Sequence, residues 1–519
     1  MPDRKFPFFS HDPQDAGPQY LEDLATAYWF SETLFTAVEA GIFTFLGPEG
    51  KTAGEIAPAL GLEPQGLARL LHALCMLGLL HHDGGHFSNT QLSGEYLVAG
   101  KKYYQGESIL WRKSLAGRWT GLKQCLKAGG RTDYSPEMED PANLSGRIRR
   151  YIAAMNCTAQ VKAREILPIF GSALEQGELL DAGAGSGALA AGFLEHFPKL
   201  RATLMDIPGV LDHTREFISS QNLNERVSCC AANILEPWPF SQGKFDLVIL
   251  SNIIHAYSET ELPHILANAA ECLKPKGLII IHDFFLEHCP EKAALFDLNM
   301  LINTYNGRVF SQDLIMEGLS KLGLCTTGPV PLGTDTGLII AAKNEEELSR
   351  LQLDKGAVLV SRVRALGFRR VKPVPVDMIH VPGWPDMRCR FGCSRYGSPH
   401  CPPHSPSPKK TKEIMEDYTS AILLEGEPPT KEFQLRVLKA EKEAFTLGFY
   451  KAFAFWAGPC SLCPECPRTG KCRNTKDSRP SMEGAGIDVF ETVRRAGFAL
   501  RTLDRKTDFV KYFALILLE

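Results

Sequence analysis

Hydrophobic residues recur at helical spacing from about residue 20 to residue 105, in LFTAVEAGIFTFL, TAGEIAPALGL and QGLARLLHALCMLGLL. Thr52 and Glu55 carry a capping-box signature at the start of the second of these helices. Two short segments then flank a turn at Asp83-Gly84-Gly85, a pattern typical of a hairpin. Three helices followed by a hairpin predict a winged helix over residues 19–105.

Residues 106–343 change from helices to an alternation of strands and helices. The helical part contains large side chains that belong either to the core or to the lining of a substrate pocket: Trp111, Trp119, Tyr151 and Met155. Farther on, apolar runs such as LLDAG, ATLMDI and FDLVILSN alternate with amphipathic helices. This alternation predicts an α/β domain built on a doubly wound parallel sheet.

The last third of the chain has a different pattern. A charged helix followed by a Pro-Val run predicts a linker helix at residues 344–375. In residues 376–519, the apolar runs AILLEG, YKAFAFWAG, FALRTL and FALILLE are interleaved with two helices, which predicts a small α+β domain. At the other end, residues 1–18 show no period and are predicted to form a loose arm.

A glycine-rich turn between a strand and a helix is the most informative stretch. In LLDAGAGSGALAAGF, Asp181 ends the strand and Gly183, Gly185 and Gly187 follow at alternate positions. Glycines let the backbone turn sharply and approach a ligand, and the first N–H groups of the helix favour an anionic group. Asp206 ends the next strand about 20 residues farther on, as expected for a carboxylate that binds ribose hydroxyls. The stretch therefore predicts a site for a nucleotide-like cofactor.

Charge and apolar content narrow the range of partners. The formal net charge of -3 gives no general attraction to nucleic acid or to an anionic membrane. The sequence begins without a signal-type apolar segment and has no apolar run long enough to span a bilayer, so we expect a soluble cytoplasmic protein. The third helix of the winged helix carries one arginine and is otherwise mostly apolar, so its face is predicted to pack against protein and not against DNA.

Cysteines are concentrated in the last third of the chain. Seven of the 15 form two runs: Cys389, Cys393 and Cys401, then Cys460, Cys463, Cys466 and Cys472. In a reducing compartment, clustered cysteines indicate metal or redox chemistry. The second run is close to the ferredoxin C-x2-C-x2-C pattern and favours a 4Fe-4S cluster over zinc.

The first run supplies only three thiolates. Three cysteine ligands leave one iron of a cluster open, so that the cluster can bind substrate instead of passing electrons. Alternatively, His380, His400 or His404 could fill the fourth place, or the seven cysteines could be shared differently between one or two clusters.

The first 343 residues resemble the small-molecule O-methyltransferases, which pair a winged-helix dimerisation domain with a class I domain that binds S-adenosylmethionine. LLDAGAGSG, LMDIPGVL, FDLVILSNIIHAYSE and LKPKGLIIIHDFF carry the resemblance. It implies a homodimer formed through the winged helix, a small-molecule acceptor and a reversed hairpin at the edge of the sheet. It also implies the cofactor contacts: Asp181, Gly183 and Gly185 around the methionine moiety, Asp206 at the ribose, Asn233 and Ile234 at the adenine, with Gly187 and Ser251 as further contacts.

The same resemblance makes His255 the candidate general base. The methyl group on a sulfonium is already activated, so the enzyme needs an in-line nucleophile and a base that takes the acceptor's proton near neutral pH. The sequence departs from the plant-type pattern in having Ala256 and Tyr257 after this histidine, which weakens the case for base catalysis. The alternative is that His255 only closes the pocket, and a thiolate acceptor, which needs little help to lose its proton, would make that alternative more attractive. Asp283, at the end of the next strand, is either a partner of this histidine or a helix cap.

Residues 375–519 resemble a family described only as a predicted metal-binding domain, through CRFGCSRYGSPHCPPHSPSP, GPCSLCPECPRTGKC and RPSMEGAGIDVFETVRRAGF. The chain is therefore interpreted as a methyltransferase for an O or S nucleophile, fused to an iron-sulfur domain that binds or orients a soft substrate such as a thiolate or sulfide. One alternative is an ordinary O-methyltransferase with a structural zinc or electron-transfer domain. Another is a metal-responsive regulator whose winged helix binds DNA.

Overall fold

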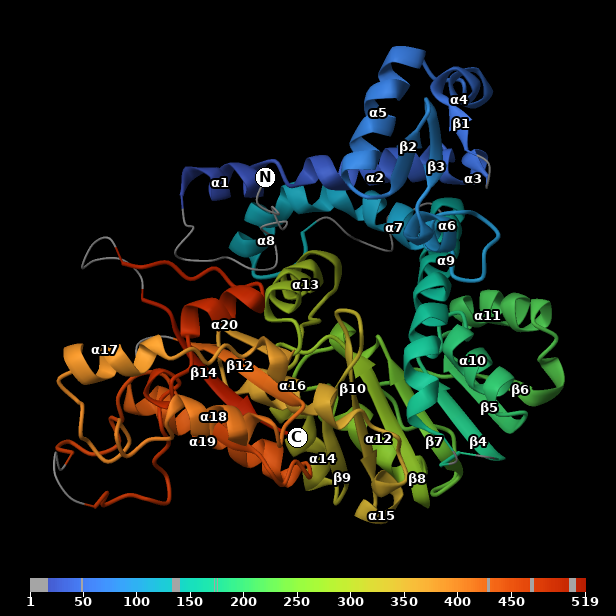
Figure 1. Ribbon diagram of the computed structural model, residues 1–519. Coiled ribbons are helices and arrows are strands. Elements are labelled where there is room, and N and C mark those ends of the chain that lie inside the picture. The colour runs from blue at the N-terminus through green and yellow to red at the C-terminus, as the bar shows by residue number, and fades with distance from the viewer. Residues whose placement is uncertain are drawn as a thin grey trace. The chain divides into compact units, whose positions relative to one another are not determined.

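The computed structural model describes residues 17–47, 50–132, 141–171, 173–174, 176–426, 430–466, 471–503 and 510–519. The loose arm expected at residues 1–18 lies almost wholly outside these ranges. The described residues divide into two compact units (Figure 1). The first comprises residues 17–328 and 332–353, and the second comprises residues 329–331 and 354–519 without the gaps just given.

The first unit opens with helices and a small sheet. They are α1 (Pro18–Ala25), α2 (Tyr28–Glu39), α3 (Ile42–Leu46), α4 (Ala53–Leu60) and α5 (Pro64–Met76), with β1 (Lys51–Thr52), β2 (Leu80–Asp83) and β3 (His86–Asn89) in the sheet order β1-β3-β2. Thr52 and Glu55 form both hydrogen bonds of the predicted capping box. The apolar face of α5 buries Leu67, Leu71 and Leu74 in the core of this region, so it packs against protein as its sequence predicts.

Helices connect this region to the large sheet. They are α6 (Gln91–Tyr96), α7 (Gly106–Ala116), the 3-10 turn η2 (Gly117–Gly121), α8 (Leu122–Ala128) and the long α9 (Pro141–Ile166). Helix α9 packs against both α7 and α10 (Ala188–His196), and therefore joins the helical region to the α/β domain.

The α/β domain is a seven-stranded sheet with the order β6-β5-β4-β7-β8-β10-β9. The strands are β4 (Gln176–Ala182), β5 (Lys199–Asp206), β6 (Val227–Ala231), β7 (Phe245–Ser251), β8 (Leu273–Asp283), β9 (Cys325–Pro331) and β10 (Gly337–Ala342). Strands β6, β5, β4, β7 and β8 are parallel to one another, whereas β10 runs antiparallel to β8. Further helices of the domain are α11 (Pro208–Ser220), α12 (Leu262–Cys272), α13 (Pro290–Asn303), α14 (Gln312–Lys321) and α15 (Glu345–Ser349).

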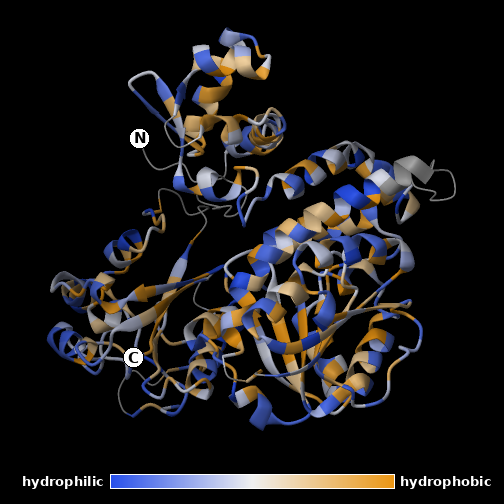
Figure 2. Ribbon diagram, turned by 90° about the vertical axis from the view of Figure 1, so that its right-hand side faces the viewer, coloured by the Kyte–Doolittle hydropathy of each residue, from blue (hydrophilic) through white to orange (hydrophobic). Residues whose placement is uncertain are grey.

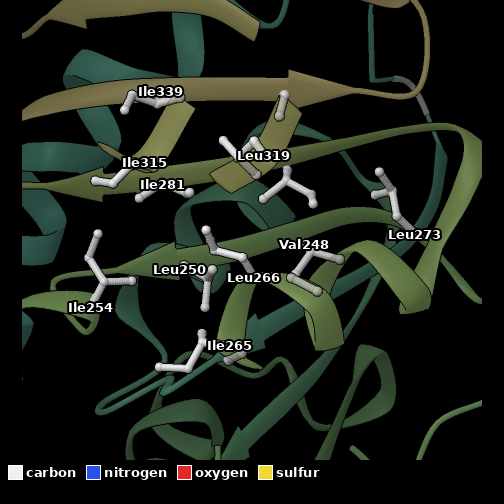
Figure 3. Packing of buried hydrophobic residues seen from close by; sticks show 14 of the residues in the cluster. Val248, Leu250, Ile254, Ile265, Leu266, Leu273, Ile281, Ile315, Leu319 and Ile339 are labelled. Carbon is white, nitrogen blue, oxygen red and sulfur yellow. The ribbon is translucent and has the colours of Figure 1, made fainter. Parts of the chain in front are cut away.

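A continuous apolar core holds helices against this sheet. Leu250, Ile281 and Ile339 lie on the adjacent strands β7, β8 and β10 and are fully buried. They belong to one cluster with Leu266 of α12 and Leu319 of α14 (Figure 3). The strands of the sheet carry mostly hydrophobic residues (Figure 2), as expected for parallel strands that are covered on both faces.

The second unit is built on an antiparallel sheet with the order β11-β12-β14-β13. Its strands are β11 (Arg370–Pro375), β12 (Ser420–Gly426), β13 (Phe453–Phe455) and β14 (Tyr512–Leu517), and its helices include α16 (Lys355–Ala365), α17 (Trp384–Gly392), α18 (Pro408–Met415), α19 (Lys431–Thr446) and α20 (Val489–Arg495). Ile422 and Leu424 of β12 belong to one apolar core, and Leu423 belongs to another. The sheet is therefore covered on both faces.

Two expectations about this unit are wrong. The run FALRTL, residues 498–503, is not a strand, although Phe498 is buried against Phe513 with ring centroids 5.2 Å apart. The predicted linker at 344–375 contains more than a helix, because β11 pairs with β12 and α16 contributes Leu359 to the core. The second unit thus begins near residue 354.

Within the described ranges, no helix is both long enough and apolar enough to cross a membrane.

Candidate functional site

The glycine-rich turn joins the end of β4 to the start of α10. Gly183, Gly185 and Gly187 all have positive φ, at 78°, 54° and 79°. A Cβ at Gly183 would lie 2.7 Å from Ile253 Cγ1, and one at Gly187 would lie 2.7 Å from Leu204 Cδ1. A Cβ at Gly185 would meet nothing within 4 Å. The backbone of Gly185 therefore borders open space, where a ligand can approach it closely.

Asp206 holds this turn from the end of β5. Its Oδ2 accepts a hydrogen bond from the Gly185 amide at 2.9 Å, and its Oδ1 accepts one from the Ile207 amide at 2.8 Å. Burial raises the pKa of this carboxyl, and the two amides lower it. The neighbouring Asp181, in β4 one residue before its end, is only 2% exposed, and burial together with the charge of Asp206 raises its pKa to about 7. Two acidic side chains thus border the turn that was predicted to hold the cofactor.

The raised pKa of Asp181 predicts a stability that falls as the pH rises. Its ordinary value is 3.8 and its folded value is about 7, so between these values the folded protein holds a proton that the unfolded chain has lost. The folded state is therefore progressively disfavoured across that window. We expect the thermal unfolding midpoint of the cofactor-free protein to fall more steeply between these pH values in the wild type than in Asp181→Asn. Identical pH dependence of the two proteins would contradict this expectation.

The remaining predicted cofactor residues lie along the same edge of the sheet or in the turn after β6. Asn233 is in that turn, and its Oδ1 accepts a hydrogen bond from the backbone amide two residues on, at 3.1 Å. The Ile234 side chain is buried in the core with Met205 and Trp238. Ser251 ends β7, and its Oγ lies 2.8 Å from His282 Nδ1. The side chains of Ile234 and Ser251 thus have partners within the protein.

His282 is a buried residue that sequence reasoning did not single out. Its Nε2 lies 2.9 Å from Thr336 Oγ1, and its Nδ1 faces Ser251. Burial, aided by the charge of Lys162, lowers the pKa of His282 to about 3. The imidazole is therefore neutral and links the ends of β7 and β8 to the loop before β10.

His255 and Asp283 meet at the carboxyl edge of the sheet. His255 lies in the 3-10 turn η6 (Ile254–Ala256) after β7, and Asp283 ends β8. The Nδ1 atom of His255 lies 2.5 Å from Asp283 Oδ1, and its backbone amide donates to Oδ2 at 3.3 Å. Asp283 is fully buried and the His255 side chain is 14% exposed. The aspartate is thus a partner of the histidine and favours the tautomer that leaves Nε2 free to accept a proton.

A cavity of about 350 Å³ opens beside His255. Three of the four large side chains noted in the sequence line it, together with two phenylalanines: Trp111, Tyr151, Met155, Phe284 and Phe296. The fourth, Trp119, instead donates from Nε1 to Asn299 Oδ1 at 3.3 Å. The His255 ring meets the Phe296 ring edge to face, with centroids 5.1 Å apart. The cavity therefore has flat apolar walls and a histidine at its boundary.

Charged side chains that sequence reasoning missed also line this cavity. Arg112 comes from α7, Lys162 from α9 and Asp335 from the loop before β10. Lys162 is 4% exposed, and its Nζ has no hydrogen-bond partner, although the Glu165 carboxylate lies 3.9 Å away. Burial lowers the pKa of both Arg112 and Lys162. Arg118 and Arg147 add further positive charge, so the wall as a whole favours an anion.

The first cysteine run surrounds a separate cavity in the second unit. Cys389, Cys393 and Cys401 all line this cavity of about 180 Å³, together with Arg395 and Glu483. Burial and the neighbouring thiolates of Cys393 and Cys389 raise the pKa of Cys401 to about 11. In the described part of the chain no three His, Cys, Asp or Glu side chains converge to hold a single metal ion. Three thiols around a cavity suit a cluster, which is larger than one ion.

The second run lies in the loop after β13, with residues 467–470 outside the described ranges. Burial, and then the charges of Cys466, Cys472 and Cys463, raise the pKa of Cys460, so these thiols are near one another. The charge of Cys466 also adds to the raised pKa of Cys401, which is caused first by burial.

Comparisons with known proteins agree with this division. Residues 22–99 match the family described as O-methyltransferase dimerisation domain, and residues 120–323 match the O-methyltransferase domain. Residues 372–518 match a family described as predicted metal-binding protein (DUF2284).

Curated relatives cover the first part of the chain. The chain is 28% identical over 319 residues to a 3-hydroxy-5-methyl-1-naphthoate 3-O-methyltransferase from Streptomyces sahachiroi, covering 60% of this chain and 92% of the relative. It is 25% identical over 335 residues to a mitomycin biosynthesis 6-O-methyltransferase from Streptomyces lavendulae, covering 61% and 92%.

Solved structures are similar over the same region. An O-methyltransferase family protein from Burkholderia thailandensis has a TM-score of 0.55 at 26% identity, covering 63% of this chain and 98% of that one. Human N-acetylserotonin methyltransferase in complex with SAM has a TM-score of 0.56 at 24% identity, covering 64% and 99%, which shows the fold.

Proposed function

Since this chain is an S-adenosylmethionine-dependent methyltransferase that carries the dimerisation and catalytic domains of the O-methyltransferases, we propose that it methylates a hydroxyl group of a small aromatic acid. The observation that carries the proposal is the His255–Asp283 pair beside the cavity of the first unit. A thiolate acceptor would need little help to lose a proton, whereas a hydroxyl needs a base. The oriented histidine therefore favours oxygen as the acceptor atom.

The chemistry follows from the positions of these residues. When bound, S-adenosylmethionine supplies a methyl group on a positively charged sulfur, so the acceptor oxygen needs only alignment and loss of its proton. Asp206 and the backbone around Gly185 would hold the cofactor at the glycine-rich turn, because the carboxylate suits ribose hydroxyls and the turn borders open space. His255 Nε2 takes the hydroxyl proton, and the buried Asp283 stabilises the resulting imidazolium.

The walls of the cavity support an aromatic acid as the acceptor class. Trp111, Phe284 and Phe296 offer flat apolar surfaces, and Arg112 and Lys162 offer positive charge. A buried ammonium group without a hydrogen-bond partner is costly, and a carboxylate ligand would provide that partner. The relative from Streptomyces sahachiroi is named for a hydroxylated naphthoate, which has the same combination of groups.

Replacing Lys162 with methionine tests this class. We expect KM for a hydroxynaphthoate to rise about 10- to 100-fold, because a hydrogen bond to a charged group is lost, and KM for a naphthol without the carboxylate to stay unchanged. Steady-state methylation with both acceptors measures the difference. Lys102→Met is the matched control, since this exposed lysine pairs with Glu195 at 3.5 Å on the surface. An equal effect on both acceptors would contradict the proposal.

The dimerisation domain supports a homodimer. Exposed apolar side chains of α1 and α2 are candidates for its interface, above all Leu21, Tyr28 and Trp29, which are 67%, 61% and 58% exposed.

A second proposal concerns the metal-binding domain, which we infer holds a 4Fe-4S cluster between Cys389, Cys393 and Cys401. The cavity of about 180 Å³ that these three thiols line supports a cluster, which is larger than a single ion. The second run, Cys460 to Cys472, is the candidate for a further cluster or for zinc. In a cluster held by three cysteines, each thiolate binds a different iron and the fourth iron has no protein thiolate. That iron would attract a soft ligand such as a thiol or sulfide.

Metal analysis of protein purified without oxygen tests this assignment. We expect iron and acid-labile sulfide in similar amounts, and a large loss of both in Cys401→Ser, because two cysteines cannot hold the cluster in this cavity. Cys325→Ser, which changes a thiol outside both runs, should keep the full content. Zinc without sulfide would contradict the assignment and favour a structural role for the domain.

A further inference from the structure

Glu483 is the one carboxylate in the wall of the three-cysteine cavity. It lies in the 3-10 turn η8 (Glu483–Ala485), within the stretch RPSMEGAGIDVFETVRRAGF and far along the chain from the first cysteine run. Burial raises the pKa of its carboxyl, whereas its own amide, the Gly458 amide and the Ser481 hydroxyl lower it. Its Oε2 atom is nevertheless buried without a hydrogen-bond partner.

This oxygen is unusual because a buried carboxylate ordinarily has a cation or donors for both oxygens. Among the described residues, Arg395 is the one basic side chain that lines the cavity with Glu483. Its charge acts on Cys389, whose pKa is raised by burial, then by Cys393, then by Glu483. The carboxylate thus lies close to the thiols that would hold a cluster.

The histidines considered as fourth ligands are placed elsewhere. His380 Nδ1 lies 3.2 Å from Arg495 Nη2, in a different pocket. His400 Nε2 lies 3.0 Å from Cys472 Sγ, in the second cysteine run. His404 is exposed and does not line the three-cysteine cavity.

From these contacts we infer that Glu483 is the fourth, exchangeable ligand of the cluster held by Cys389, Cys393 and Cys401. The inference rests on the proposed cluster. An iron atom supplies the positive partner that Oε2 lacks, and a carboxylate is a harder ligand than thiolate, so a thiol can replace it. Glu483 therefore sets how readily a soft ligand reaches the fourth iron.

The experiment uses the full chain, purified without oxygen and enriched in 57Fe. Mössbauer spectroscopy of the wild type should distinguish one iron site of the cluster held by Cys389, Cys393 and Cys401. The parameters of that site should differ from those of the three thiolate-bound sites. Addition of 2-mercaptoethanol should change that site alone. In Glu483→Gln, iron and sulfide content should persist, the electron paramagnetic resonance signal of the reduced cluster should shift, and 2-mercaptoethanol should bind about tenfold more tightly, because the competing ligand is gone.

Asp386→Asn is the matched control, since this carboxylate also acts on Cys389 but does not line the cavity. It should leave the spectra and the thiol affinity as in the wild type. Wild-type protein without iron and sulfide would overturn the proposed cluster. Protein with the cluster but with four equivalent thiolate-bound irons, or with unchanged spectra and thiol affinity in Glu483→Gln, would overturn the role of Glu483 and leave the cluster standing. The wild-type spectrum decides the matter even if the variant does not fold.

Discussion

Replacing His255 with alanine is expected to lower kcat for a hydroxyl acceptor by about 10²–10⁴-fold, the usual contribution of a positioned general base. The reason is the geometry at the edge of the sheet, where Asp283 fixes Nδ1 at 2.5 Å and leaves Nε2 to take the proton. The glycine-rich turn lies on other strands, so binding of S-adenosylhomocysteine, measured by calorimetry, should be unchanged. Single-turnover methylation measures the chemical step.

Asp283→Asn should give a smaller loss of the same kind, because an amide can keep the ring in place but cannot stabilise the imidazolium as a carboxylate does. His264→Ala is the control, since this exposed histidine of α12 lies outside the cavity. Full activity of His255→Ala toward a hydroxyl acceptor would reduce the histidine to a residue that closes the pocket.

Alanine substitutions at two glycines of the turn should have different effects. The substitution at Gly185 should mainly impair use of the cofactor, and the one at Gly187 should mainly lower the stability of the fold. At Gly185 the added methyl meets no protein atom within 4 Å, so the fold should survive with the modest cost of a non-glycine residue at φ 54°. The same methyl would occupy the space beside the turn, so kcat/KM for S-adenosylmethionine should fall about 10²-fold. Steady-state kinetics at fixed acceptor concentration measures this loss.

At Gly187 the methyl would lie 2.7 Å from Leu204 Cδ1 and 3.3 Å from Thr214 Cγ2. Overpacking of this kind costs about 1–3 kcal/mol, and the positive φ adds about 1–2 kcal/mol. The Gly187→Ala variant should therefore be less stable than Gly185→Ala, and its thermal unfolding midpoint should be lower. If Gly185→Ala were the less stable variant, or kept wild-type kinetics, the placement of the cofactor at Gly185 would be wrong.

Sequence patterns predicted the α/β domain well because its strands are continuous apolar runs that end in chemistry-bearing residues. Asp181 and Asp206 lie at or next to the ends of buried strands, and the parallel order β5-β4-β7-β8 places the strand ends at one edge. The second unit was harder to predict. Pro373 and Pro375 suggested a linker, yet proline is compatible with an edge strand such as β11. FALRTL was wrongly predicted to be a strand because its apolar residues resemble a strand pattern. In the structure Phe498 is buried, but the segment does not form a strand.

The site was predictable where neighbouring strands define it. His255 and Asp283 are separated by 28 positions in the sequence, which left open whether Asp283 is a partner of the histidine or a helix cap, and the register of β7 and β8 brings them together. Arg112 and Lys162 could not be found, since charges on amphipathic helices usually face water. Glu483 lies within the recognised stretch RPSMEGAGIDVFETVRRAGF, but its distance along the chain from the first cysteine run hid its place beside those cysteines.

The most direct test of base-assisted O-methylation is competition between two acceptors in one reaction. The full-length protein receives S-adenosylmethionine with a labelled methyl group, together with equal amounts of a hydroxynaphthoate and the corresponding mercaptonaphthoate, and mass spectrometry locates the label. We expect a labelled methyl ether on the hydroxy acid, greatly reduced in His255→Ala. Label on sulfur alone, in amounts that do not depend on His255, would contradict this expectation.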